Sequence, residues 1–226
     1  MQQMIPAVDY NQIITRLTNA FLSQHRDNAS NCVRMVGIVF ARPSSPLAKS
    51  EIIPALADWH HRSGDHVHFF FAGYDRYRQR PGFIRVAVPG MDDWGYGPEV
   101  FNDIRQQIES RTKWQYSGGC DLLLTNARFD SATQKADIDF SSTIVCQLDA
   151  MKEDKAIPSV ERFFESIFRF AESADDRDPT WGFSDKQGLS VAGSALKRVV
   201  LSLLPRNLAA DYRKAVHFAI RDVAAT

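Results

Sequence analysis

The segment from Val36 to Ala41, with the sequence VGIVFA, constrains the fold of this chain more than any other. It is a short, continuous apolar run that ends shortly before Pro43, and such a run is typical of a β-strand covered on both faces. Strands of this kind belong to sheets whose two faces are covered by helices. We therefore expect this segment to be the central strand of an α/β sheet.

Four further segments have the pattern of strands, because each is an apolar or alternating run bounded by turn residues. They span His66–Tyr74, Gly82–Val88, Asp121–Phe129 and Ala136–Leu148. A polar turn at 75–81 joins the first two, and another at 130–135 joins the last two, so we expect two hairpins. The sequence thus predicts a mixed sheet of about five strands with flanking helices.

Helical periodicity of apolar residues predicts the helices around this sheet. They cover about 9–23, 50–63, 98–108, 158–171, 190–204 and 208–224. The helix over 158–171 carries more phenylalanine than the surface of a monomer tolerates, so it packs either on the sheet or on a partner. The first helix is an N-terminal addition, and the last two form a C-terminal pair.

Without the 82–88 strand and the outer helices, the order of elements over about Val36 to Ala171 is β-α-β-α-β-β-α, which resembles the connectivity of the thioredoxin-like fold. The family's redox chemistry needs a cysteine pair just after the first strand, but Arg42-Pro43-Ser44-Ser45-Pro46 stands there. The family's proline before the third strand is also absent, since the sequence there is Ser117 to Cys120. The resemblance therefore implies a fold and disfavours thiol oxidoreductase chemistry.

The chain divides into an α/β domain with an N-terminal helix over 1–174, a polar linker over 175–187, and a helical extension over 188–226 that packs on the domain. Three scattered cysteines without a C-x-x-C pair predict reduced thiols. No signal peptide is apparent, and the apolar stretch 189–204 is shorter than the ~20 residues that span a bilayer. We expect a soluble, cytoplasmic protein without a membrane segment.

The loop after the 36–41 strand is the first candidate site, and it contains Arg42, Ser44, Ser45 and Lys49. In open α/β sheets ligands gather at the carboxyl ends of strands, and a helix that begins there attracts anions. These residues suit a phosphate or a carboxylate. The alternative is an ordinary strand-to-helix turn, since serine and proline are common in such turns.

The second candidate site interleaves aromatic and basic side chains after the 66–74 strand. Its residues are Tyr74, Arg76, Tyr77, Arg78 and Arg80. Such a mixture suits a protein interface, and it also suits phosphate contact with base stacking. The chain has 27 basic and 27 acidic residues, which disfavours nucleic acid without ruling it out. A solvated hairpin turn is the plain alternative.

The third candidate is a divalent-metal set made of His66, His68, Asp137 and Asp139. Two histidines two residues apart on a strand project to the same side, and imidazole and carboxylate are ordinary metal ligands. The spacing is weak by itself, because histidines near the end of a helix and the start of a strand also have structural roles. This set is therefore kept as an alternative only.

From these patterns we expect a non-catalytic module that binds a protein partner or a second copy of itself. The contact would be made by the phenylalanine-rich helix, the C-terminal helices or the Tyr/Arg segment. A metal-dependent hydrolase or nuclease and a binder of a small phosphate-bearing ligand are the alternatives, so whether the chain is an enzyme stays open. No cofactor is expected.

Overall fold

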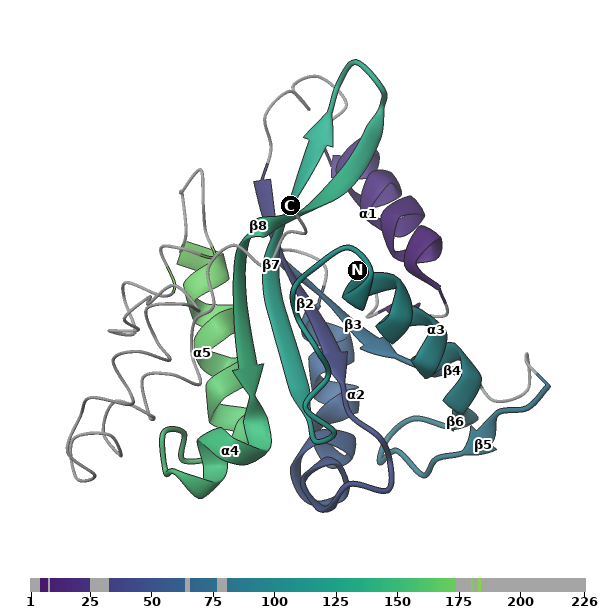
Figure 1. Ribbon diagram of the computed structural model, residues 1–226, viewed down its shortest axis with the longest axis vertical. Helices are drawn as coiled ribbons and strands as arrows, with labels where there is room; N and C mark the ends of the chain where they lie inside the picture. Colours follow the sequence, from purple (N-terminus) through teal and green to yellow (C-terminus); the bar gives the residue numbers. More distant parts are fainter. Residues whose placement is uncertain are drawn as a thin grey trace.

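A computed structural model describes residues 5–7, 9–24, 33–63, 66–76, 81–173, 180 and 183. The chain has a mixed α/β fold whose main sheet contains strands in the order β3-β2-β7-β8 (Figure 1). These strands are β2 (Val33–Phe40), β3 (Val67–Ala72), β7 (Asp121–Asp130) and β8 (Lys135–Gln147). β2 and β3 are parallel, whereas β7 is antiparallel to both of its neighbours, β2 and β8. The prediction that 36–41 is a central strand is confirmed.

The outer edge of β3 pairs with a short strand that the sequence patterns did not reveal. This strand, β1 (Ile5–Ala7), runs parallel to β3. The predicted 82–88 strand does not join the main sheet. Instead β5 (Ile84–Arg85) belongs to a small antiparallel sheet with β4 (Tyr74–Arg76) and β6 (Trp94–Tyr96), in the order β4-β6-β5.

The expected hairpin between 66–74 and 82–88 is therefore wrong. The apolar run that suggested one strand is divided at Gly73, whose φ of 82° lies in the left-handed region. The chain turns there, so that β3 stays in the main sheet and β4 enters the small one. The expected hairpin of β7 and β8 is confirmed.

Helices cover both faces of the main sheet (Figure 1). α1 (Tyr10–Gln24) and α3 (Pro98–Glu109) lie on one face, where Phe21 contacts Phe129 and Phe101 contacts Phe40. The other face is covered by α2 (Ile53–Arg62), which follows the π-helical turn η1 (Ala48–Ile52), and by α5 (Val160–Ser173). The short α4 (Leu148–Glu153) follows β8 directly.

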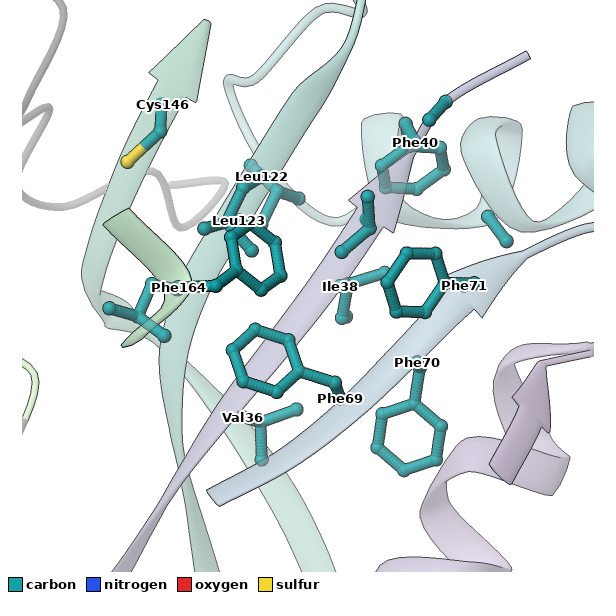
Figure 2. Close-up of a cluster of buried hydrophobic side chains, with 14 of the residues drawn as sticks. Val36, Ile38, Phe40, Phe69, Phe70, Phe71, Leu122, Leu123, Cys146 and Phe164 are labelled. Atoms are coloured by element: carbon teal, nitrogen blue, oxygen red, sulfur yellow. The ribbon is translucent and has the colours of Figure 1, made fainter. Parts of the chain in front are cut away.

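The phenylalanine-rich helix α5 packs on the sheet, which decides between the two alternatives that its sequence left open. Phe164 is fully buried and stacks on Trp59 of α2, with ring centroids 4.1 Å apart. It also stacks on Phe69 of β3, with centroids 4.9 Å apart, and Figure 2 shows these two rings side by side. Phe69 in turn lies over Gly37 of β2, where a Cβ atom would come within 2.3 Å of its ring. The absence of a side chain at Gly37 is what admits this ring.

The alternation of side chains along β8 changes phase at a bulge. Leu124 of β7 pairs with Ile144, but Asn126 pairs with Asp139, so five steps along β8 match two along β7. These two step counts differ by an odd number, so the side chains of β8 exchange faces at the bulge. The even-numbered residues of β8 face α1 before the bulge and α5 after it. The buried Thr125 hydroxyl donates to the Asp139 carbonyl at 2.8 Å, so this carbonyl group at the bulge has a hydrogen-bond partner. The Thr143 hydroxyl in turn donates to the Thr125 hydroxyl at 3.0 Å.

Two described residues fall within the predicted linker 175–187, and both are buried. The backbone N–H and the hydroxyl of Thr180 donate to the side-chain oxygen of Asn126 at 3.2 and 2.7 Å. Phe183 contacts the rings of Phe163 and Phe170 on α5. The predicted extension 188–226 lies outside the described residues, so the division into domains stays a prediction. No helix among the described residues is long and apolar enough to cross a bilayer.

Candidate functional site

The loop that follows β2 lies at the carboxyl ends of β2 and β3, as the sequence predicts for a ligand site in an α/β sheet. A residue outside the loop holds its first peptide group in place, because the hydroxyl of the buried Tyr74 donates to the Ala41 carbonyl at 2.8 Å. The next residue, Arg42, is exposed. The N–H of Ser45 donates to the Arg42 carbonyl at 2.9 Å, and the chain then enters the helix that leads through η1 to α2.

The guanidinium of Arg42 rests on aromatic rings. Its central carbon lies 5.2 Å from the ring centroid of Phe101 and 5.4 Å from that of Tyr116, which is cation–π distance. Its positive charge also acts on the Tyr96 hydroxyl. In the described part of the chain no carboxylate forms an ion pair with Arg42.

The phenols beside Arg42 are neutral. Burial raises the pKa of Tyr96 to about 12, although the charge of Arg42 opposes this rise. Burial likewise raises the pKa of Tyr116 to about 12, where Arg42 lowers it and Asp121 raises it. The Tyr116 hydroxyl donates to the Gly119 carbonyl at 2.5 Å. Near neutral pH the positive charge of Arg42 is therefore not neutralised by a phenolate.

Cys120 sits against the same loop from the β7 side. Its sulfur lies 3.3 Å from the Ser45 hydroxyl oxygen, and its backbone N–H donates to the carboxylate of Asp149. Burial raises the pKa of the Cys120 thiol to about 12, with the Ser45 hydrogen bond opposing the rise. The thiolate is the reactive form of cysteine, so this thiol is unsuited to nucleophilic or redox chemistry.

A fully buried carboxyl group, that of Asp121, begins β7 next to Cys120. It accepts hydrogen bonds from the Ser117 N–H at 2.9 Å and from the Ser117 hydroxyl at 2.5 Å. Burial raises the pKa of Asp121 above its usual value, and the bonds from Ser117 act in the opposite direction. The site thus combines the exposed Arg42 with acidic groups held behind the loop.

The other residues of the first predicted site lie along the same segment. Ser44 is exposed in the turn, and Lys49 is exposed on η1, where its N–H donates to the Ser45 carbonyl at 3.1 Å. The sequence patterns missed Tyr96 and Tyr116 as neighbours of Arg42. Both are more than fifty residues from Arg42 along the chain, and no spacing rule connects a loop after β2 with β6 or with the segment before β7.

The second predicted site is not assembled as a continuous surface among the described residues. Tyr74 is fully buried and serves the Ala41 contact, while Arg76 is exposed at the end of β4. Tyr77, Arg78 and Arg80 lie outside the described residues. The Tyr/Arg interface therefore stays a prediction.

The residues of the predicted metal set do not come together. His68 is buried on the α1 face, with its Nε2 atom 3.3 Å from Nη1 of Arg34, and burial lowers its pKa to about 4. His66 is exposed. Asp139 pairs with Arg128 at 2.9 Å, on the face covered by α5. Asp137 is exposed beside it on β8. Among the described residues, no three His, Cys, Asp or Glu side chains are grouped to hold a metal ion.

Comparisons with protein-family models, with curated proteins and with solved structures found no match for this chain. The assignment of function therefore rests on the geometry of the loop after β2. That geometry offers hydrogen-bond donors and a guanidinium that no carboxylate of the described residues pairs with, beside a thiol that stays protonated. Such an arrangement suits the binding of an anion better than a chemical step.

Proposed function

We propose that this chain is a non-catalytic binding module with a thioredoxin-like fold, and that it binds a small anionic ligand at Arg42. The proposal is carried by the surroundings of the Arg42 side chain. Its guanidinium stacks on Phe101 and Tyr116 and has no carboxylate partner among the described residues. A guanidinium whose orientation is fixed by stacking loses little entropy when it binds a carboxylate or a phosphate.

The thioredoxin-like part of the proposal is supported by the connectivity of the main sheet. Two parallel neighbours, β2 and β3, are joined through α2, and an antiparallel β7 stands between β2 and β8. With the small sheet and the short α4 set aside, the elements from β2 to α5 also follow one another in the order β-α-β-α-β-β-α. β1, which adds to the outer edge of β3, is an extension of the same sheet.

Two observations support a module without redox function. The turn after β2, where thioredoxin-like enzymes carry their cysteine pair, has Arg42 to Pro46 instead. The neighbouring thiol of Cys120 is buried, and its pKa is raised to about 12. A thiol of this kind has almost no thiolate at neutral pH. In this chain Arg42 therefore stands where a redox enzyme of this fold would have its reactive cysteines.

The proposal is tested by titrating the full chain with acetate and with inorganic phosphate at constant ionic strength, with backbone amide NMR shifts as the readout. We expect saturable shifts for residues around Arg42 and at least a tenfold weaker affinity in Arg42→Gln. Arg85→Gln is the matched control, because Arg85 is an exposed arginine on β5. Equal binding by wild type and Arg42→Gln, or no saturable binding of either anion, would overturn the proposal.

A protein partner is the second candidate, and an exposed apolar residue on a strand edge favours it. Ile84 is 61% exposed on β5, the outer strand of the small sheet. Free strand edges can pair with a second chain. If the chain self-associates there, sedimentation velocity will show a concentration-dependent dimer that Ile84→Asp abolishes. Leu22→Asp is the control, since Leu22 is exposed on α1. A monomer at all concentrations contradicts self-association through this edge.

A further inference from the structure

We infer that Asn126 on β7 and the rings of Phe163 and Phe170 on α5 form a docking site for a helical segment that has threonine and phenylalanine three residues apart. The chain's own Thr180 and Phe183 occupy this site, and the same segment of a second copy of the chain can take their place. This inference goes beyond the proposed function, because no part of it depends on the anion site.

The polar half of the site is the side chain of Asn126, which is fully buried within β7. Burying an amide is costly unless hydrogen bonds compensate for the loss of water. Its oxygen accepts from the hydroxyl of Thr180 at 2.7 Å and from the backbone N–H of the same residue at 3.2 Å. The hydroxyl bond makes the site selective for threonine, since a valine of the same shape has no side-chain donor.

The apolar half of the site is the side of α5 that bears Phe163 and Phe170. These residues are two helical turns apart, so they lie on the same side of the helix. The ring of Phe183 is fully buried against them, with its centroid 6.2 Å from that of Phe163 and 5.4 Å from that of Phe170. The contact with Phe170 is edge to face, an arrangement that aromatic pairs favour.

The helix α5 is therefore aromatic on two sides. Phe164 and Phe168 contact Phe69 of the main sheet, whereas the other side receives the ring of Phe183. Packing on the sheet thus accounts for only part of the phenylalanine content of this helix. The docking of Phe183 accounts for the other part.

The occupant of the site offers both of its anchors from one side of a helix. Thr180 and Phe183 have helical backbone, and side chains three residues apart in a helix are neighbours on its surface. The hydroxyl and the ring are therefore presented together. Anchors at such spacings are a general means by which one protein recognises a helix of another. The site thus recognises the pattern Thr-x-x-Phe.

A second copy of the chain carries the same anchors and the same site, so two copies can exchange these segments without any new kind of contact. Within one chain the anchors follow closely after Ser173, the last residue of α5. Such a tether gives an effective concentration on the order of millimolar at the site. A segment from another molecule competes only at its actual concentration. We therefore expect binding in trans to be strong only when the chain's own anchors are removed.

The inference is tested with a fluorescent peptide that has the sequence of residues 175–187, which is the segment as a second copy presents it. The full chain with Thr180→Ala and Phe183→Ala lacks both of its own anchors. We expect this variant to bind the peptide saturably in fluorescence anisotropy, and the wild type to bind it at least tenfold more weakly. Equal binding by the two chains, or no saturable binding to the variant, overturns the inference and leaves the proposed anion site standing.

Substitutions in the peptide test each half of the site without disturbing the fold of the chain. Thr180→Val in the peptide removes the hydroxyl and should weaken binding at least threefold. Phe183→Ala in the peptide removes the ring and should weaken binding at least tenfold. A peptide with the same composition in scrambled order is the control and should not bind. Undiminished binding of the Thr180→Val or the Phe183→Ala peptide contradicts the polar or the aromatic half, respectively.

Thermal denaturation shows whether the peptide binds the folded chain. A ligand that binds only the folded state raises Tm, so the peptide should raise the Tm of the doubly substituted chain and leave that of the wild type unchanged. If circular dichroism shows the doubly substituted chain to be unfolded, Phe183→Leu takes its place, because leucine keeps an apolar side chain in the site. The peptide should bind Phe183→Leu at least threefold more tightly than the wild type. A Tm that the peptide leaves unchanged in the folded variant overturns the inference.

Discussion

The sulfur of Cys120 lies 3.3 Å from the hydroxyl oxygen of Ser45, and this contact joins the start of β7 to the loop that follows β2. It places a thiol beside the loop where the thioredoxin-like fold that we propose would carry a reactive cysteine pair. Burial keeps this thiol protonated, since the pKa of Cys120 is raised to about 12. Cys120 thus brings sulfur near this position without the thiolate that redox chemistry needs.

The protonated state of Cys120 predicts slow alkylation. In a Cys32→Ser background, which removes the cysteine outside the described residues, iodoacetamide at pH 8 should label the folded chain at least ~100-fold more slowly than the unfolded chain. Cys146 is also buried, with its pKa raised by burial, and should behave alike. Mass spectrometry of timed samples measures the rates, and labelling in guanidinium chloride is the control. Comparable rates with and without denaturant would show that a thiol is accessible and ionised.

The contact between Phe69 and Gly37 predicts that β2 does not tolerate a side chain at this position. A Cβ atom in Gly37→Ala would come within 2.3 Å of the Phe69 ring, so the ring must move, and overpacking of this kind costs about 1–3 kcal/mol. Urea denaturation measures the loss. Phe69→Leu in the same chain should make the effect of Gly37→Ala smaller. Additive losses in the double variant would mean that the two side chains do not compete for space.

The burial of His68 predicts a loss of stability in mild acid. The pKa of His68 is about 4 in the folded chain, against 6.5 for an ordinary histidine such as that of the unfolded chain. Between these two pH values the unfolded chain binds a proton at His68 and the folded chain does not. This contribution is complete above pH 6.5 and is lost as the pH falls from 6.5 to 4, by roughly 3 kcal/mol.

Urea denaturation between pH 7 and pH 4 measures this effect. We expect His68→Gln to have a shallower dependence on pH than the wild type over this window. His66→Gln is the control, because His66 is exposed two residues earlier and should leave the dependence unchanged. If the His68 and His66 variants follow the same pH curve, His68 is not the group responsible.

The position of Phe164 predicts that α5 belongs to the core. Phe164→Ala removes a ring that stacks on both Trp59 and Phe69, and such substitutions cost about 3–5 kcal/mol. Glu161→Ala on the exposed side of the same helix should change the free energy of unfolding by less than ~0.5 kcal/mol. Thermal or urea denaturation compares the two. A small loss in Phe164→Ala accompanied by weaker self-association would instead mean that this face is an interface.

Sequence reasoning located the long strands because their physical signal is local. The run 36–41 is apolar without interruption, since both faces of β2 are covered by helices, and the alternation over 136–140 follows the pleat of β8 before its bulge. The same reasoning gave one strand over 66–74, because nothing local indicates that Gly73 turns the chain out of the main sheet. It also missed β1, which has three residues and is defined by its pairing with β3.

The candidate site was predicted only in part, for a related reason. Arg42 and Ser45 could be found, because a loop after a buried strand is a known place for ligands. Their surroundings could not, since Phe101 and Tyr116 reach Arg42 from α3 and from the segment before β7, both more than fifty residues along the chain. Conversely, the H-x-H spacing of His66 and His68 looked like a ligand pair, whereas burial and Arg34 give His68 a structural environment.

By itself, the sequence located the long strands β2, β7 and β8 and the helices α1, α2, α3 and α5, and it showed that the turn after β2 has no cysteine pair. These properties depend on hydrophobic periods and on residue identity, which are local. The tertiary structure alone decided that α5 covers the sheet, that Tyr74 braces the Arg42 loop, and that the Cys120 thiol is kept protonated. Each of these depends on which distant groups surround a side chain, because burial and neighbouring charges are set by packing across the whole chain.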